Sequence, residues 1–292
     1  MIGVVQGTGS SIPKKILSND ALSKVVETDD LWIRERTGVH RRHIVSDENT
    51  VSMAIDAARK ALDSGKKDAR DIDMIIVATA SSNVIMPNTA CMVQAAIGAS
   101  KAICYDLNAA CSGFIFAYNT AQAYIAMGVV ENVLVIGAET LSKLVDWSDR
   151  GTCILFGDGA GAVLLTAVEG ECEPMVMHSK GSAGEALICN ANEEMNTDNY
   201  MQMNGQKVFN FAVKEVPNII KEVIEKKKID KNEIDYFVLH QANKRIVELV
   251  AKRLDISIDK FPMNLQEYGN TSSASIPILL DELNRLGKLK AG

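Results

Sequence analysis

The sequence lacks the features that mark several large classes of protein. It has no excess of positive charge: the formal net charge is −6 and the isoelectric point is about 5.4. This argues against general nucleic-acid binding, which favours a basic surface. No apolar run approaches the roughly 18 residues of a membrane-spanning helix. We therefore expect neither a nucleic-acid partner nor a membrane anchor.

Signals for export and for metal binding are also missing. The first residues, MIGVVQGTGSSIP, lack the charged segment and apolar core of a signal peptide. The cysteines form no CxxC pair and show no spacing typical of metal ligands; they are Cys91, Cys104, Cys111, Cys153, Cys172 and Cys189. Reduced thiols in the cytoplasm, with no bound metal, are the simplest interpretation.

What the sequence does contain is a regular alternation of short apolar runs and longer helical patterns. Hydrophobic residues make up 47% of the chain, so a large core can form. Apolar runs predict strands at 2–6, 73–80, 101–107, 132–137 and 160–167. Helical periodicity predicts helices at 50–64, 87–98 and 112–127. The order predicts an α/β fold with mostly parallel strands and helices on both faces.

A polar stretch at 168–205 separates this region from a second one. Beyond it we expect a helix at 208–226, a strand at 235–239 and helices at 244–254 and 275–286. The chain therefore divides into two halves of similar α/β layout, 1–168 and 169–292. No convincing sequence repeat relates them, so a duplication would be visible only in the structure.

The glycine-rich run FGDGAGA, at 156–162, resembles a phosphate-binding loop only superficially. Such a loop needs a following lysine and a helix whose N-terminus faces the phosphate. Here the glycines lead into the strand-like AVLLTA. A tight turn with close backbone packing is the better interpretation.

Cys111 is the first candidate for chemistry, because it falls where the predicted strand 101–107 gives way to the helix at 112–127. Free N–H groups and the positive end of the helix dipole stabilise a thiolate there. The same N–H groups can hold the oxyanion formed when a thioester is attacked. A small buried core residue remains the alternative, since lone cysteines are usually inert.

Two residues in the second half are possible partners. His240 ends the run YFVL, and functional residues in α/β sheets gather at the carboxyl ends of strands. Asn270 lies in EYGNTSSASIP, where a helix cap or a turn would also favour it. Each has a structural alternative when taken alone. Together, Cys, His and Asn can activate a thiol and polarise a carbonyl.

At these positions the sequence resembles a known family. NAACSGF around Cys111, VLHQAN around His240 and YGNTSSASIP around Asn270 resemble motifs of β-ketoacyl-[acyl-carrier-protein] synthase III, of the thiolase superfamily. WIRERTGVHRRH (32–43) and RGTCILFGDGAGA (150–162) do so too. The resemblance implies a thiolase-like fold of two duplicated halves in an α-β-α-β-α layered core. It also implies a homodimer.

The family's reaction implies a role for each of the three residues. Cys111 would take the acyl group from an acyl-CoA primer and release CoA. Malonyl-acyl carrier protein would then lose CO₂, and His240 and Asn270 would donate hydrogen bonds to the resulting enolate. The enolate would attack the acyl-cysteine and give a 3-oxoacyl-carrier protein. Acyl-CoA is a substrate in this scheme, and no cofactor is expected.

The resemblance extends to binding residues. Trp32 and Arg150 would sandwich the adenine of CoA and Arg36 would contact its phosphates, while Thr28, Gly205 and Asn243 match the pantetheine tunnel. A half-buried helix residue is the alternative for Trp32. The segment after His240 would dock the acidic carrier protein, with a solvated helix face as the alternative; its residues are Gln241, Ala242, Asn243, Lys244, Arg245, Lys252 and Arg253.

Two departures from the family pattern stand out. The family usually continues past LNRLGKLKAG with two closing strands and a glycine-rich loop that supplies an oxyanion donor, and we expect these to be missing here. Met86 stands where phenylalanine is common in enzymes selective for acetyl primers. A flexible methionine in the primer pocket would admit longer or branched chains; filling the same volume as phenylalanine is the alternative.

Three competing functions remain open. A type III polyketide synthase or another secondary-metabolite condensing enzyme would use free CoA thioesters. A papain-like cysteine hydrolase has the same Cys, His, Asn order, although the strand–helix joint at Cys111 disfavours it. A truncated, inactive paralogue would act only as a binding partner, against which the intact Cys111, His240 and Asn270 argue.

Overall fold

A five-stranded sheet forms the centre of the protein. The computed structural model of the chain describes residues 1–190 and 200–290. The strand order is β1-β7-β6-β4-β5, with bounds β1 (Ile2–Ser11), β4 (Met74–Ala78), β5 (Ile103–Leu107), β6 (Asn132–Thr140) and β7 (Asp158–Val168). All five predicted strands of the first half are confirmed in position.

The directions of the strands differ in part from the prediction. β4 runs parallel to both β5 and β6, but β7 is antiparallel to β6 and to β1. Four strands, β1, β4, β5 and β6, therefore run in one direction, and the expectation of mostly parallel strands fails only at β7. A parallel pair needs a crossover that passes over a face of the sheet. The connection from β6 to β7 instead stays at the end of the sheet, where it forms short helical turns.

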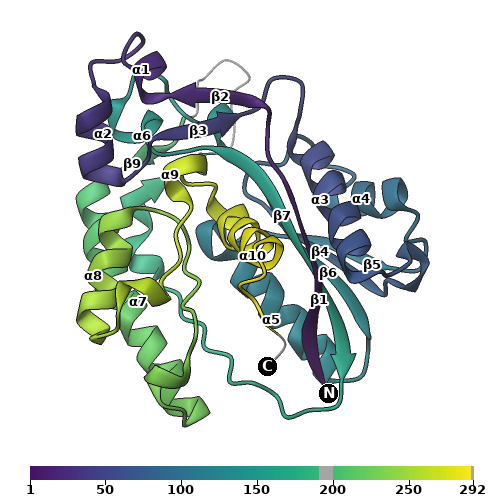
Figure 1. Cartoon of the computed structure of the whole chain (residues 1–292). Helices are drawn as coiled ribbons and strands as arrows, with labels where there is room; N and C mark the ends of the chain where they lie inside the picture. The colour runs from purple at the N-terminus through teal and green to yellow at the C-terminus, as the bar shows by residue number, and fades with distance from the viewer. Residues whose placement is uncertain (191–199, 291–292) are drawn as a thin grey trace.

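Helices cover both faces of this sheet (Figure 1). α3 (Thr50–Gly65) and α4 (Thr89–Ile97) lie on one face, and α5 (Gly113–Ala126) and α10 (Ser275–Arg285) lie on the other. In β4, Ile75 and Val77 pack towards α3, whereas Met74 and Ile76 pack towards α5. Burial on both faces explains why this strand is apolar throughout.

Glycines allow the second half of the chain to approach the sheet closely. A Cβ atom on Gly137 would lie 2.3 Å from the carbonyl oxygen of Ser273, and one on Gly161 would lie 2.5 Å from the backbone nitrogen of Ile278. Only glycine permits such contacts. Close packing by FGDGAGA is thus confirmed, but the predicted turn is wrong, because Gly159 and Gly161 belong to β7.

Smaller elements form a cap beyond the carboxyl ends of β4, β5 and β6, at the top of Figure 1. A separate apolar cluster around Ile33, Cys153 and Phe156 holds the cap together. The cap contains two antiparallel strand pairs, namely β2 (Lys15–Ser18) with β3 (Arg41–Ile44), and β8 (Leu187–Ile188) with β9 (Gln202–Met203). The short helices are α1 (Asn19–Leu22), α2 (Asp30–Thr37), α6 (Arg150–Cys153) and α9 (Leu265–Tyr268).

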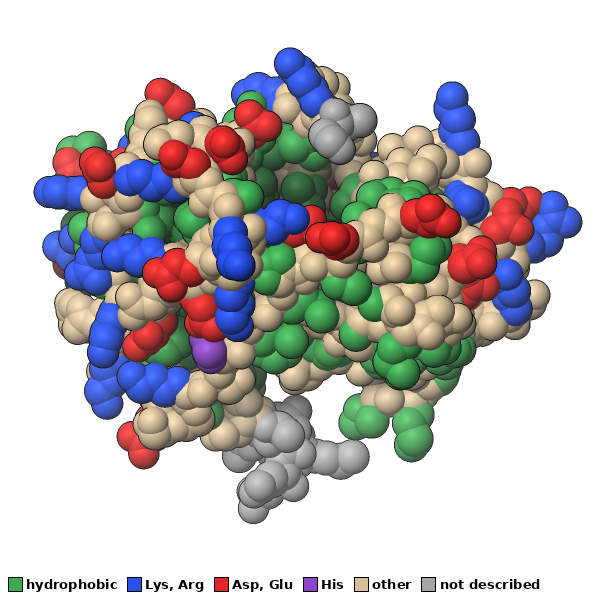
Figure 2. Space-filling model, turned by 90° about the horizontal axis from the view of Figure 1, so that it is seen from below, with side chains coloured by type: hydrophobic (Ala, Val, Ile, Leu, Met, Phe, Trp, Pro, Cys, Tyr) green, Lys and Arg blue, Asp and Glu red, His purple; other side chains and the backbone are tan. Residues whose placement is uncertain are grey.

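The second half contributes an outer layer made of α7 (Gly205–Lys227) and α8 (Lys244–Leu254). The predicted strand at 235–239 is wrong: within the described residues this segment pairs with no strand, and Phe237 only donates a backbone hydrogen bond to Lys260, over 2.8 Å. An apolar run becomes a strand only beside a partner strand. Figure 2 shows hydrophobic side chains across the middle of the lower face, between the α7–α8 side and the α3–α4 side.

The two halves are closely interlocked. α10, from the end of the chain, packs against β7 and β1 of the first half. The end of β7 at Val168 coincides with the predicted boundary between halves, which stays a prediction. Among helices in the described part of the chain, none combines the length and apolar character required to span a membrane.

Candidate active site

Cys111 lies at the joint between an edge strand and a helix, as predicted. β5 ends at Leu107, a 3-10 turn, η2 (Ala110–Ser112), follows, and α5 begins at Gly113. The residue before Cys111, Ala110, has a φ of 45°, in the left-handed region that non-glycine residues rarely adopt. No side chain caps the N-terminus of α5, so its first N–H groups are not taken by a cap.

The environment of the Cys111 thiol disfavours its ionisation. Burial raises the pKa of this thiol, the interaction with Ser272 lowers it, and the charge of Glu139 raises it again. The net direction is upward, so Cys111 keeps its proton at neutral pH in the resting site. Burial therefore opposes the thiolate that the helix terminus favours. Forming the nucleophile requires a group that takes this proton.

His240 is held by the hydroxyl group of Ser275. The His240 Nδ1 and Ser275 Oγ atoms are 2.6 Å apart, and the Gln241 backbone N–H donates to the same Oγ over 3.2 Å. The hydroxyl oxygen has two lone pairs and one proton, so Ser275 can donate that proton to Nδ1 while it accepts from Gln241. In that arrangement the ring proton is on Nε2, an atom that is buried and has no partner within the described residues. Burial lowers the pKa of His240 to about 4, so the ring is neutral.

Asn270 is a buried residue whose amide is oriented by the backbone. Its side-chain Oδ1 accepts a hydrogen bond from the backbone N–H of Ser272 over 2.8 Å. Its backbone N–H donates to the Leu155 carbonyl. The turn role that the sequence allowed is therefore present. The same bond occupies the amide oxygen and leaves the NH₂ group as the donor of this side chain.

A short segment that begins with Asn270 and ends with Ser275 contains one of the three predicted catalytic residues and contacts the other two. Asn270 is its first residue. The Ser272 hydroxyl interacts with the Cys111 thiol, and Ser275 bonds to His240. We call it the serine segment; its 3-10 turn packs against the turn that holds Cys111. The structure thus brings together three motifs that lie far apart in the sequence.

Cys111 and Ser272 line a cavity of about 800 Å³. Its wall mixes polar groups with apolar side chains, as in sites that bind small organic molecules. The apolar contributors include Ile85, Leu141, Leu144, Phe156, Leu187 and Met201. A thioester carbonyl at Cys111 would have room for an acyl chain within this cavity.

Three of the residues predicted to bind CoA, Trp32, Arg36 and Arg150, form a cluster in the cap. The guanidinium carbon atoms of Arg36 and Arg150 lie 4.8 and 4.7 Å from the Trp32 ring centroid. Asn243 donates to the Arg36 carbonyl over 3.0 Å, and the Thr28 hydroxyl is buried without a partner in the described part of the chain. A flat ring with two cations is suited to a base and phosphates.

Gly205 and Asn243 each begin a helix. Gly205 is the first residue of α7, after the cap residue Asn204. Asn243 caps α8, because its Oδ1 accepts from the Arg245 N–H over 2.9 Å. Asn243 is linked to the Trp32 cluster because its side chain donates to the Arg36 carbonyl. The neighbour of Gly205 is Met203, whose terminal methyl carbon would lie 3.8 Å from a Cβ atom placed on the glycine.

The predicted carrier-protein segment is partly buried, and one member needs correction. Gln241 is 1% exposed, donates to the Leu239 carbonyl and accepts from the Asn264 N–H. Its side chain holds the backbone together and cannot form part of a docking surface. Ala242 packs against the α7–α8 core. The cationic residues are exposed, namely Lys244, Arg245, Lys252 and Arg253.

Met86 lies at the tip of an exposed loop. Its side chain is 85% exposed and that of Ile85 is 92% exposed. Two adjacent apolar side chains in solvent are unfavourable unless a partner covers them. Ile85 lines the Cys111 cavity within the same chain, a contact that the sequence did not suggest.

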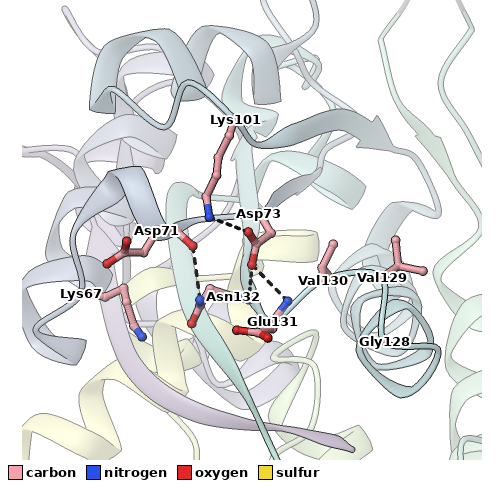
Figure 3. A pocket seen from close by; sticks show the side chains of 9 residues that line it. All are labelled: Lys67, Asp71, Asp73, Lys101, Gly128, Val129, Val130, Glu131 and Asn132. Atoms are coloured by element: carbon pink, nitrogen blue, oxygen red, sulfur yellow. Dashed lines mark hydrogen bonds and ion pairs between the residues drawn. The ribbon is translucent and has the colours of Figure 1, made fainter.

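A second cleft, of about 470 Å³, lies at the amino ends of β4, β5 and β6, away from Cys111 (Figure 3). Two of its charged groups are paired with each other. Lys101 forms an ion pair with Asp73 over 2.8 Å, and Asp73 accepts from the Glu131 and Asn132 N–H groups. These contacts join three strand ends, so this cleft has a structural explanation.

Three residues of the candidate site were missed by the sequence argument: Ser272, Ser275 and Glu139. The two serines stand within the YGNTSSASIP motif, but nothing local distinguishes them from the other serines there. Glu139 had a visible signal, because it is an acidic residue at the end of the apolar run NVLVIGA. Buried acidic residues are rare unless they are paired or functional.

The fold and this arrangement together define a thiolase-like condensing enzyme. Residues 105–184 match the profile described as 3-Oxoacyl-[acyl-carrier-protein (ACP)] synthase III, and residues 224–292 match that of its C-terminal part. The β-ketoacyl-[acyl-carrier-protein] synthase III of Clostridium botulinum (strain 657 / Type Ba4) is 49% identical, over 98% of this chain and 90% of that protein.

Solved structures agree with these matches. The 3-oxoacyl-[acyl-carrier-protein] synthase III of Aquifex aeolicus VF5 superposes with a TM-score of 0.94 at 42% identity, over 99% of this chain and 93% of that one. A priming β-ketosynthase of a polyketide pathway gives a TM-score of 0.95 at 31% identity, over 100% and 90%. The chain belongs to the 3-oxoacyl-[acyl-carrier-protein] synthase III family and is an acyltransferase of the condensing type.

Proposed function

We propose that the chain starts type II fatty acid synthesis by condensing an acyl-CoA primer with malonyl-acyl carrier protein. The products are a 3-oxoacyl-carrier protein, CoA and CO₂. Cys111 is the nucleophile and carries the acyl group. His240, through Nε2–H, and Asn270, through its amide NH₂, donate hydrogen bonds to the enolate oxygen formed on decarboxylation. No cofactor takes part in this scheme.

One segment that contains Asn270 and contacts both Cys111 and His240 carries this proposal. Asn270, the Ser272–Cys111 interaction and the Ser275–His240 bond all belong to the serine segment. A neutral imidazole with its proton on Nε2 is a donor, as enolate stabilisation requires.

The decisive test separates the two half-reactions. Cys111→Ala should give no acyl adduct after incubation with acetyl-CoA, measured by intact-protein mass. Asn270→Ala should still form the adduct but lose malonyl decarboxylation by about 10²–10³-fold, the usual effect of removing one oxyanion donor. Condensation at the wild-type rate by Asn270→Ala would rule out its assigned role.

The CoA site follows from the Trp32 cluster. Trp32 and Arg150 would stack on the adenine and Arg36 would bind phosphate, with Thr28, Asn243 and Gly205 along the pantetheine arm. Because both cations already lie within 5 Å of the Trp32 ring, one must move aside for the base. Tryptophan fluorescence should therefore change when CoA is added, and it should not change in Arg150→Ala to the same extent.

The carrier protein would dock on the start and the end of α8. Lys244, Arg245, Lys252 and Arg253 are exposed, with Asn243 and Ala242 at their edge. An acidic partner suits such a surface because complementary charge speeds the encounter. Gln241 is left out of this surface because it is buried.

Two copies of the chain would associate through β5. Within residues 1–190 and 200–290 this strand has a neighbouring strand on one side only, and Ile103 in it is 48% exposed. An open strand edge favours pairing with a second chain. Met86 would then reach the partner's primer pocket. Sedimentation of the full chain should give a dimer, and a charged substitution such as Ile103→Lys should weaken it.

A cytoplasmic location agrees with the reduced thiols expected from the sequence.

The second candidate is a priming synthase of a polyketide pathway. The likeness to a solved enzyme of that kind favours it, with a TM-score of 0.95. The identity of 31% to that enzyme is lower than the 49% shared with the Clostridium botulinum protein. Condensation with malonyl-CoA in place of malonyl-acyl carrier protein would support a polyketide synthase that works on free CoA thioesters.

A further inference from the structure

Arg42 is a buried cation whose hydrogen-bond partners carry no negative charge. It stands in β3 with 0% exposure. Within the described residues its guanidinium donates to two backbone carbonyls and one amide oxygen, and none of these partners is a carboxylate. Burial lowers the pKa of Arg42 to about 10, so the group stays charged at neutral pH. A buried charge without a counter-charge is costly, and its presence in the cap calls for an explanation.

The three partners of Arg42 belong to three different elements of the cap. Nη1 donates to the Leu17 carbonyl in β2 over 3.2 Å. Nη2 donates to Asn19 Oδ1 over 2.8 Å and to the Ile154 carbonyl over 2.7 Å. Asn19 begins α1, and Ile154 is the C-cap of α6. Because a guanidinium presents its donors in a rigid planar fork, this one side chain ties β2, α1 and α6 to β3.

Asn19 extends this link to both ends of α2. Its side-chain Nδ2 donates to Asp30 Oδ1 and to the Val39 carbonyl oxygen, each over 2.9 Å. Asp30 is the first residue of α2, and Val39 follows its cap residue Gly38. The amide of Asn19 therefore uses its oxygen for Arg42 and its two hydrogens for α2. A helix of 8 residues is not stable by itself, so contacts of this kind decide where α2 lies.

The two helices that Arg42 links carry the ring and a cation of the Trp32 cluster. Trp32 belongs to α2 and Arg150 is the first residue of α6; Figure 1 shows both helices in the cap. The Arg150 guanidinium carbon lies 4.7 Å from the Trp32 ring centroid. This distance joins side chains of two helices, so it depends on how the helices are held relative to each other. Arg42 reaches α6 directly and reaches α2 through Asn19.

We propose that Arg42 and Asn19 are positioning residues that set the spacing between α2 and α6 and thereby the affinity for the nucleotide end of CoA, an inference that rests on the proposed function. Both residues are buried, and they act through Trp32 and Arg150. The attraction between a cation and an aromatic ring extends to about 6 Å from the ring centroid. A small displacement of either helix therefore weakens the site in which the base would stack.

A role in stability alone gives a different pattern of effects. Phe156 belongs to the apolar cluster of the cap and also lines the Cys111 cavity. A cap that is loosened as a whole would therefore slow the acylation of Cys111 by any thioester. Loss of positioning at Trp32 would slow the reaction of those thioesters that carry the nucleotide. Comparing a full CoA thioester with a truncated one separates the two roles.

The test measures acylation of Cys111 by acetyl-CoA and by the acetyl thioester of N-acetylcysteamine, which lacks the nucleotide. Asn19→Ala should lower kcat/KM for acetyl-CoA about tenfold by raising KM, the equivalent of one hydrogen bond, and keep the value for the truncated thioester within about twofold. Arg42→Lys should shift the ratio of the two values in the same direction, because an ammonium group lacks the fork. In a Trp32→Ala background, Asn19→Ala should add no further shift, since the ring that it positions is gone.

A matched control removes another buried asparagine. Asn132 is hydrogen-bonded to Asp71 and Thr166 but lines the second cleft, so Asn132→Ala should keep the wild-type ratio. Equal loss with both thioesters in Asn19→Ala, or loss with neither, overturns the positioning role. If Asn19→Ala does not fold, Asp30→Ala decides, because it cuts the same link at a side chain that is 36% exposed. Absence of acylation in the wild type would refute the proposed function, and calorimetric titration with CoA would still test the positioning role.

Discussion

The Nδ1 atom of the His240 imidazole and the hydroxyl oxygen of Ser275 are 2.6 Å apart. The Gln241 N–H donates to the same oxygen, which keeps its own proton for the imidazole. We propose that Ser275 donates this proton to Nδ1 and so keeps the ring proton on Nε2. In the proposed reaction the tautomer matters, since only an Nε2–H group can donate to an enolate oxygen.

Ser275→Ala should damage the second half-reaction and leave the first intact. Without the hydroxyl, the ring can adopt the other tautomer, and we expect decarboxylation of malonyl-acyl carrier protein to fall by about tenfold or more, the equivalent of one hydrogen bond. Acylation of Cys111 should stay within about twofold. Release of labelled CO₂ measures the decarboxylation, and intact-protein mass measures the acylation of Cys111.

Ser275→Thr is the matched control because it keeps the hydroxyl. The ¹⁵N chemical shifts of the His240 ring should report Nε2–H in wild type and Ser275→Thr, and a mixture of tautomers in Ser275→Ala. If the shifts of Ser275→Ala equal those of wild type, Ser275 does not set the tautomer.

Acid should destabilise the protein partly through His240. Burial lowers the pKa of this ring from 6.5 to about 4, so the unfolded chain binds a proton at a higher pH than the folded one. Stability should therefore fall as the pH drops from 6.5 to about 4. At about 1.4 kcal/mol per pKa unit, His240 accounts for about 3 kcal/mol of that loss.

Urea denaturation at pH 7 and at pH 4.5 measures this effect. His240→Gln should lose less stability between the two pH values than wild type does. His178→Gln is the control, since the His178 side chain is 65% exposed, and it should follow the wild type. Equal acid sensitivity in His240→Gln and wild type would show that the ring is not the source.

Reversing the charge of Arg245 should impair the step that uses the carrier protein. Its guanidinium lies 5.6 Å from the Phe209 ring centroid on the exposed side of α7 and α8. In Arg245→Glu we expect the apparent KM for malonyl-acyl carrier protein to rise at least tenfold at low salt, because charge attraction speeds docking. The rate of Cys111 acylation by acyl-CoA should not change.

Arg59→Glu provides the comparison, since α3 covers the opposite side of the sheet (Figure 1). It should leave the KM for the carrier protein unaltered. Equal damage to both half-reactions in Arg245→Glu would point to a folding defect or to a CoA contact instead of docking.

Met86→Phe should narrow the choice of primer. A rigid ring closes a pocket that a flexible methionine leaves adjustable. One methylene in an apolar pocket is worth about 1–3 kcal/mol, so the ratio of butyryl-CoA to acetyl-CoA used in competition should drop by about tenfold. Met127→Phe, another exposed methionine, should leave the ratio unchanged. No change in Met86→Phe would remove this residue as a selector.

Much of the first half could be predicted from local pattern. The apolar run at 73–80 became β4, and the periodic segment at 50–64 became α3, with a capping box at Asn49 and Ser52. The position of Cys111 between β5 and α5 was visible as a change of period. These features depend on neighbours a few residues away, whose effect on the backbone is recorded in the sequence itself.

The second half shows where such patterns fail. The run at 235–239 has the composition of a strand but pairs with none within residues 1–190 and 200–290. β1 and β7 have strand patterns that carry no direction, so their antiparallel pairing could not be foreseen. Strand pairing depends on partners elsewhere in the chain, and hydrophobicity alone does not identify them.

The sequence by itself determined which residues can do chemistry: a thiol at a helix start, a histidine after an apolar run and an asparagine in a serine-rich turn. Only the tertiary structure decided their protonation and their hydrogen-bond partners. Ser275 bonds to the His240 ring across 35 positions, and Ser273 bonds to Glu139 across 134. Burial, which raises the pKa of Cys111 and lowers that of His240, exists only when distant segments pack. Protonation depends on that shared environment, and no local pattern contains it.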